Sequence, residues 1–119
     1  MDTSFANHFA KAWIAAWNSH DIDEILSHYA DDFEMTSPFI AEKTGGKTST
    51  LYGKKAVSEY WIAALQRFPD LRFELLDVLA SGHSIVIYYQ SVMDKTAAEL
   101  FVFEESGKVI KSIAHYREA

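Results

Sequence analysis

The second half of the chain alternates β-prone segments with very short connections, and this pattern limits the folds that are open to it. Residues 71–80, 83–93, 96–105 and 108–117 are rich in β-branched and aromatic side chains. Only two residues, Ser-Gly, Asp-Lys and Ser-Gly in turn, separate each segment from the next. Because connections this short join antiparallel neighbours, the pattern predicts a meander of four antiparallel strands.

The first half has the spacing of helices. Apolar residues recur at steps of three and four over residues 3–18, which predicts an amphipathic helix. Asp21, followed three residues later by Glu24, is typical of a capping box and predicts a second short helix whose apolar stripe ends at Tyr29. A third apolar stripe predicts a helix over residues 54–68.

Between the second and third helices the pattern changes twice. Residues 33–37 alternate apolar and polar side chains before Pro38, which predicts a strand that ends in a turn. Residues 42–50, EKTGGKTST, are polar and contain paired glycines, so we expect a mobile loop. These elements predict one α+β domain in which a bent sheet receives three helices on its concave face.

Charge and composition exclude several kinds of partner. Seventeen acidic residues against eleven basic ones give a net charge of -6, so nucleic acid and anionic membranes are poor partners. The chain has no Cys, no metal-binding His spacing and no phosphate-binding loop, and we expect neither a metal nor a cofactor. The opening residues lack the positive charge of a signal peptide and no apolar run is long enough to span a membrane, which predicts a cytoplasmic protein.

Five short phrases stand along the chain in a characteristic order: Trp17-Asn18-Ser19-His20-Asp21, HYADDF at residues 28–33, Ser37-Pro38, Tyr52-Gly53-Lys54 and a hairpin over residues 103–109. Together with the order of the predicted elements, they resemble the nuclear transport factor 2-like superfamily, in its SnoaL-like branch of ketosteroid isomerase-like and polyketide cyclase-like proteins. The resemblance covers nearly the whole chain and implies a single SnoaL-like domain over residues 1–119. It also implies a cone-shaped fold, in which a strongly curved antiparallel sheet packs on three helices and encloses a pocket, and a homodimer formed through the outer face of the sheet.

The residues expected to line this pocket are mostly aromatic. The helices carry more ring volume toward the sheet than a core of this size usually needs, although the same rings could simply fill the core. In the last strand, alternation and the family resemblance place Ser112 and Tyr116 on the inner face. Of the consecutive Tyr88 and Tyr89 only one can face inward, and the resemblance favours Tyr88. The predicted ligand-binding residues are Trp13, Trp17, Tyr29, Phe33, Met35, Ser37, Tyr60, Trp61, Tyr88, Phe101, Phe103, Ser112 and Tyr116.

One carboxylic acid is the catalytic candidate. Trp13 and Ser37 stand where the ketosteroid isomerases place a donor tyrosine and a proton-shuttling aspartate, which excludes steroid isomerisation by that mechanism. Glu99 matches the acid with which those isomerases help to hold an oxyanion. Strand alternation places Glu99 on one face with Phe101 and Phe103, where burial among rings would raise its pKa and suit it to proton transfer. The alternative is that Glu99 points outward and is solvated.

Three functions remain open on the sequence. The first is binding of a small apolar, oxygen-bearing molecule in the pocket. The second is a cofactor-independent isomerase, dehydratase or cyclase that uses Glu99 as acid or base. The third is a dimeric scaffold whose pocket is incidental. In the first two, residues 42–50 are a candidate lid over the pocket mouth.

Overall fold

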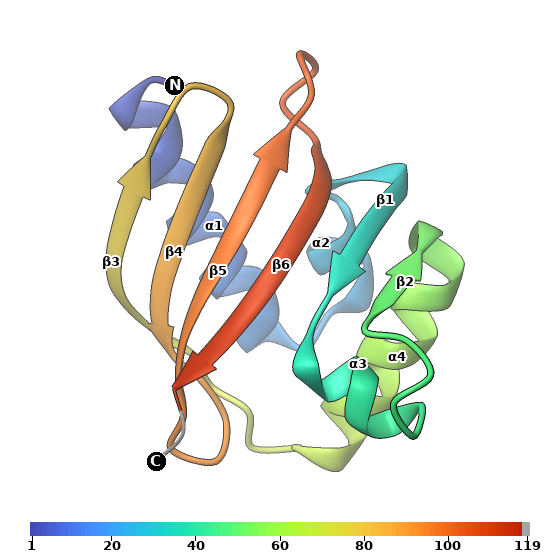
Figure 1. Cartoon of the computed structure of the whole chain (residues 1–119). Helices are drawn as coiled ribbons and strands as arrows, with labels where there is room; N and C mark the ends of the chain where they lie inside the picture. Colours follow the sequence, from blue (N-terminus) through green and yellow to red (C-terminus); the bar gives the residue numbers. More distant parts are fainter. Residues whose placement is uncertain (118–119) are drawn as a thin grey trace.

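Four consecutive strands form the predicted meander in the computed structural model, which describes residues 1–117. They are β3 (Glu74–Ala80), β4 (Ser84–Gln90), β5 (Thr96–Phe103) and β6 (Val109–Arg117), and each pairs antiparallel with the next. The strands occupy one side of the view in Figure 1. The prediction of a meander from the short connections is therefore confirmed.

Two further strands extend the sheet beyond β6. The strand β1 (Tyr29–Thr36) pairs with β6 in parallel, and β2 (Thr50–Tyr52) pairs with β1 antiparallel, which gives the order β2-β1-β6-β5-β4-β3. The sheet is thus mostly antiparallel, as expected, with one parallel pair between β1 and β6. Only Thr50 of this strand was expected in the loop, and residues 51–52 were assigned to no element, because a strand of three residues is too short to show alternation.

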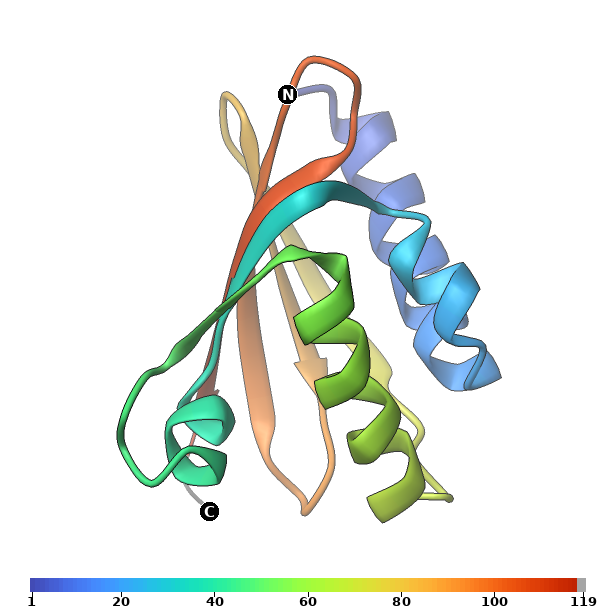
Figure 2. The same cartoon turned by 90° about the vertical axis from the view of Figure 1, so that its right-hand side faces the viewer.

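The predicted helices lie together on the concave side of the curved sheet (Figure 2). The helix α1 (Thr3–Ser19) begins where the Asp2 side chain accepts a hydrogen bond from the Ser4 backbone, and ends at His20 in a left-handed conformation. The helix α4 (Gly53–Arg67) begins at a glycine with φ of +85°, a conformation that residues with a Cβ rarely adopt. This turn directs the chain from β2 at the sheet edge onto the concave face.

The second predicted helix is shorter than expected. The helix α2 (Ile22–Leu26) is capped by Asp21, which accepts hydrogen bonds from the backbone of Asp23 and Glu24, but Tyr29 already belongs to β1. Asp31 and Asp32 lie exposed within this strand, where the pairing of β1 with β6 is irregular.

A fourth helix was missed. The helix α3 (Pro38–Lys43) begins where the Ser37 hydroxyl accepts a hydrogen bond from the Phe39 backbone, with Pro38 at the first helical position. The expected turn at Pro38 is therefore a helix start, and Glu42 and Lys43 of the expected loop are helical. The loop itself is limited to residues 44–49, which are tied by hydrogen bonds from the Thr44 hydroxyl to backbone carbonyls.

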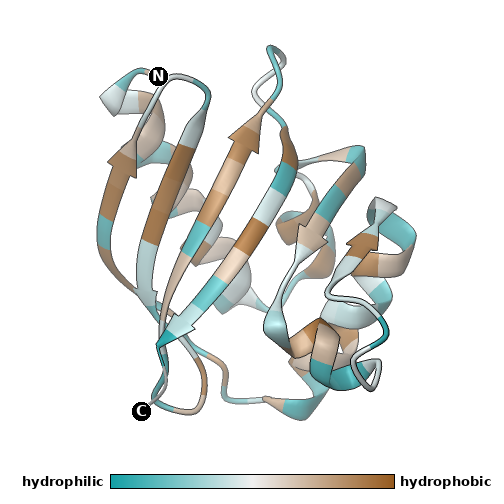
Figure 3. Ribbon diagram, in the orientation of Figure 1, coloured by the Kyte–Doolittle hydropathy of each residue, from teal (hydrophilic) through white to brown (hydrophobic). Residues whose placement is uncertain are grey.

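The core is built from aromatic rings between α1, α4 and the sheet. Trp13 is fully buried and donates a hydrogen bond of 2.8 Å from Nε1 to the Tyr29 hydroxyl. Figure 3 shows the hydrophobic stretches of β4 and β5 that contribute to this core. In the described residues, no helix combines the length and the apolar character that a membrane span requires.

The outer face of the meander also carries an apolar row. Leu79, Val86, Leu100 and Ile113 are register partners across β3, β4, β5 and β6, and the side chain of Leu79 is largely exposed. The homodimer expected through this face stays a prediction.

Candidate functional site

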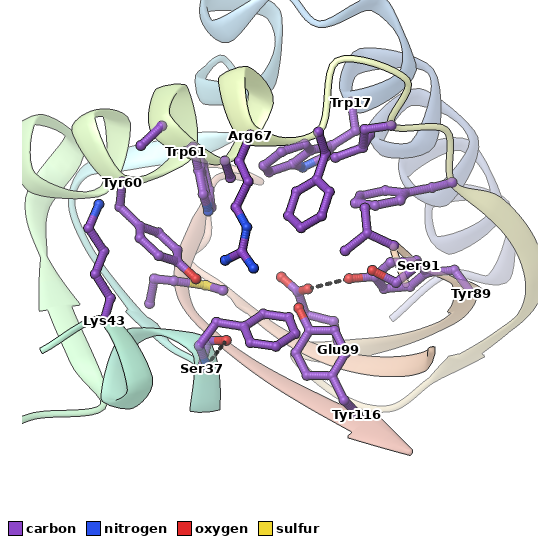
Figure 4. A pocket seen from close by; sticks show the side chains of 18 of the residues that line it. Trp17, Ser37, Lys43, Tyr60, Trp61, Arg67, Tyr89, Ser91, Glu99 and Tyr116 are labelled. Carbon is purple, nitrogen blue, oxygen red and sulfur yellow. Dashed lines mark hydrogen bonds between the residues drawn. The ribbon is translucent and has the colours of Figure 1, made fainter. Parts of the chain in front are cut away.

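A cavity of about 390 Å³ lies between the concave face of the sheet and the helices α1, α3 and α4 (Figure 4). Its volume falls within the range of pockets that bind small molecules. Most of its wall is aromatic or aliphatic, and a few polar side chains converge on it. Eight of the predicted residues line this cavity: Trp13, Trp17, Met35, Ser37, Tyr60, Trp61, Glu99 and Tyr116.

The meander brings three of the polar groups together. Tyr89 on β4 and Tyr116 on β6 are both register partners of Ala97, which lies between them on β5. Glu99 is the next residue on the same face of β5. Because Ala97 has only a methyl side chain, the two rings have room on either side of it and their hydroxyls can reach toward the carboxyl group.

Glu99 is buried in the cavity wall, with 3% of its surface exposed. The Tyr89 hydroxyl donates a hydrogen bond of 3.0 Å to its Oε1 atom. Burial raises the pKa of Glu99 from 4.5 to about 7, and the hydrogen bond from Tyr89 partly offsets this effect by stabilising the carboxylate. Near neutral pH, Glu99 therefore exists as both the acid and the carboxylate, as a group that exchanges protons should.

The phenols around Glu99 remain protonated. Burial, with a smaller contribution from the Glu99 charge, raises the pKa of Tyr60 to about 12 and raises those of Tyr29, Tyr89 and Tyr116 well above their ordinary value. At neutral pH each of these hydroxyls keeps its proton, and that of Tyr89 is donated to Glu99. The cavity thus places one buried carboxyl group among neutral phenols.

Two other predicted polar groups are already engaged within the protein. The only donor of Trp13, its Nε1–H, goes to Tyr29, so it is not free to orient a ligand. The Ser112 hydroxyl is fully buried and donates to the sulfur of Met35 at 2.8 Å. By contrast, the indole of Trp17 lines the cavity, and its buried Nε1 has no hydrogen-bond partner within residues 1–117.

The two consecutive tyrosines of β4 point in the directions opposite to those expected. Tyr89 is 2% exposed and lines the cavity, whereas Tyr88 is 40% exposed on the outer face. The expectation that Tyr88 faces the pocket is wrong, because Ile85, Ile87 and Tyr89 alternate on the inner face of the strand. This alternation was visible in the sequence as a signal in favour of Tyr89.

Five other predicted residues lie behind the cavity wall. The rings of Tyr29 and Phe33 pack with their centroids 4.4 Å apart, and the rings of Phe101 and Phe103 pack against Phe9 with centroid distances of 5.2 and 4.9 Å. These four and Ser112 are buried but do not line the cavity, which differs from the expectation that they line the pocket. The four aromatic rings fill the core instead, which is the alternative stated for the aromatic residues from the sequence.

Several cavity residues were not predicted. Phe39 and Lys43 come from the missed helix α3, while Arg67 and Phe68 lie where α4 ends. Of the candidate lid over residues 42–50, only Glu42 and Lys43 contribute to the cavity wall. Within the described part of the chain, no group of three His, Asp or Glu side chains is arranged to hold a metal ion.

Comparison with known proteins agrees with this architecture. Residues 10–117 match the SnoaL-like domain family. The crystal structure of a SnoaL-like protein of unknown function from Burkholderia thailandensis is 44% identical, with 99% of each chain covered and a TM-score of 0.95. The sequence matches no curated protein.

More distant solved structures share the fold alone. An NTF2-like protein of unknown function from Cytophaga hutchinsonii is 12% identical, with 94% of this chain and 89% of the other covered and a TM-score of 0.68. TerC, co-crystallised with polyporic acid, is 18% identical, with 94% and 92% covered and a TM-score of 0.75. On the family match over nearly its whole length, the chain belongs to the SnoaL-like domain family, within the NTF2-like superfamily.

Proposed function

We propose that the protein binds a small apolar molecule that carries an oxygen atom, with this oxygen directed toward Glu99 and Tyr116. The observation that supports the proposal most strongly is the cavity of about 390 Å³, which has aromatic walls and one buried carboxyl group. Apolar walls favour a hydrophobic body by removing its surface from water. A few buried polar groups then select a ligand that can satisfy them.

The proposal predicts a preference between two otherwise similar probes. 2-Naphthol should bind about three- to tenfold more tightly than naphthalene at neutral pH, because its hydroxyl forms a hydrogen bond in the cavity. Replacing Tyr116 with phenylalanine keeps the ring and removes the hydroxyl, so this preference should shrink. Isothermal titration calorimetry measures both affinities.

Tyr88→Phe is the matched control, because it removes the same hydroxyl from the outer face of the sheet. It should leave both affinities unchanged. Failure of the wild-type protein to bind either probe would contradict the proposal. Equal affinities for the two probes would show that the oxygen atom of the ligand does not contribute to binding.

The pKa of Glu99 supports a second candidate function. With a pKa of about 7, Glu99 is suited to remove a proton from a carbon beside a carbonyl group and to return it at another position. We propose, as the alternative, a cofactor-independent isomerase, dehydratase or cyclase in which neutral tyrosines stabilise the oxygen anion that forms. Conversion of a bound molecule that the Glu99→Gln variant abolishes would distinguish this function from binding alone.

A further inference from the structure

The charge at the outer end of the cavity points to a property of the ligand. Arg67 is the last residue of α4, and its side chain extends into the cavity (Figure 4). Its guanidinium carbon lies 5.0 Å from the centroid of the Phe68 ring, which also lines the cavity. This cation–π contact with the ring leaves the N–H groups of the guanidinium able to bind a ligand.

Arg67 and Glu99 differ in their exposure to solvent. Arg67 is exposed and therefore lies at the mouth, whereas Glu99 is almost fully buried. Within residues 1–117, no carboxylate lies at salt-bridge distance from Arg67. The shifted pKa of Glu99 is explained by burial and by Tyr89, without a contribution from Arg67.

The remaining charges of the cavity do not neutralise Arg67. Glu42 and Lys43 are neighbours on α3 and carry opposite charges, so together they contribute no net charge to the rim. The Lys43 ammonium lies over the Tyr60 ring, 5.5 Å from its centroid. The mouth thus has one surplus positive charge in a protein whose net charge is -6.

We infer that the ligand carries an acidic group that is ionised at neutral pH, such as a carboxylate, and that this group pairs with Arg67 at the mouth. The inference rests on the proposed binding function and adds the charge and the orientation of the ligand. A carboxylate is recognised by the guanidinium fork through two parallel hydrogen bonds. The opposite orientation would place the anion beside Glu99, where two buried negative charges repel each other.

The helical wall offers a further donor for such a ligand. Trp17 lines the cavity, and its buried Nε1 is without a partner in the described residues. A buried donor that makes no hydrogen bond is unfavourable unless something in the cavity accepts it. A ligand with an oxygen atom near Trp17 would satisfy this donor.

The test compares two probes of the same shape, 2-naphthoate and its neutral amide 2-naphthamide. At low salt and neutral pH, the wild-type protein should bind 2-naphthoate about tenfold more tightly than 2-naphthamide. The Arg67→Gln variant should lose this preference through weaker binding of 2-naphthoate, while its affinity for 2-naphthamide stays unchanged. Raising the salt concentration from about 50 to about 500 mM should weaken only the binding of 2-naphthoate, because the mouth is open to solvent.

Lys55→Gln provides the matched control. Lys55 is exposed on α4, and its replacement removes the same charge from the same helix outside the cavity. Both probes should bind this variant as they bind the wild type. Loss of the preference in Lys55→Gln as well would overturn the assignment to Arg67, since a general effect of net charge would then account for it.

The outcomes separate this inference from the function on which it rests. Equal or tighter binding of 2-naphthamide by the wild-type protein would overturn the inference and leave the proposed function standing. If neither probe binds, both fail.

Discussion

Replacing Glu99 with glutamine is expected to raise the free energy of unfolding by about 3 kcal/mol at about pH 8, and to change it little at about pH 4. The pKa of Glu99 is about 7 in the folded protein and near 4.5 when the chain is unfolded. Between these values the folded state binds more protons, so the wild-type protein loses stability as the pH rises. Below about pH 4.5 the neutral acid carries no such penalty, and above about pH 7 the penalty is complete. At about 1.4 kcal/mol for each pKa unit, the total is about 3 kcal/mol.

The groups that face Glu99 do not obscure this effect. Tyr29, Tyr60, Tyr89 and Tyr116 all have raised pKa values and stay neutral throughout the window. Glutamine keeps an oxygen that can accept the hydrogen bond from Tyr89. Urea unfolding of both proteins at a series of pH values therefore isolates the titration of Glu99, because every other group contributes equally to both curves.

The control is Glu105→Gln, at an exposed position of the β5–β6 connection. Its stability should differ from that of the wild type by less than about 0.5 kcal/mol at every pH. A stability difference between Glu99→Gln and the wild type that stays constant with pH would show that Glu99 does not titrate in the predicted window.

Replacing Ala64 with tryptophan is expected to weaken binding of 2-naphthol by about a hundredfold while the protein still folds. Ala64 lies on α4 and its side chain lines the cavity, so an indole at this position occupies the space that the ligand needs. A two-ring ligand buries about 200 Å² of apolar surface, as a tryptophan side chain does, which is worth about 5 kcal/mol. If the indole takes up the space for half of the ligand, half of this binding free energy is lost, which lowers the affinity about a hundredfold.

Calorimetry measures the affinity of this variant, and thermal unfolding reports its stability. Ile62→Trp is the control, because Ile62 lies on the same helix with its side chain partly exposed outside the cavity. Unchanged binding by the Ala64→Trp variant would place the ligand elsewhere on the protein.

Much of the fold could be predicted from periodicity and connection length. Two-residue connections require antiparallel neighbours, and the alternation of β5 placed Glu99 on the inner face. The elements that were missed are short. The helix α3 has six residues and β2 has three, so neither repeats a pattern often enough to be recognised. In hindsight, Ser37-Pro38 is a helix start signal as well as a turn signal.

The site could be predicted less completely, because alternation determines the face of a strand and not the depth along it. Glu99, Phe101 and Phe103 all face inward, yet only Glu99 reaches the cavity. The two phenylalanines lie further along β5, where Phe9 of α1 packs directly against the sheet. Whether an inward-facing ring packs in the core or lines the cavity depends on how the helices pack on the sheet.

Arg67 was missed for a different reason. In the sequence it is a basic residue at the end of a helix, where a positive charge is common because it interacts favourably with the helix dipole. Only the position of α4 over the sheet shows that its side chain extends into the cavity. A charge at a helix end does not indicate by itself whether it faces solvent or a pocket.

The central claim is that Glu99 lies in the wall of a cavity that takes up an apolar molecule. An NMR titration of the ¹³C-labelled Glu99 carboxyl group, without and with 2-naphthol, tests it most directly. We predict a pKa of about 7 in the free protein and a different value with 2-naphthol, because the ligand's hydroxyl forms a hydrogen bond with the carboxyl group. A pKa near 4.5 that does not respond to 2-naphthol would contradict the claim.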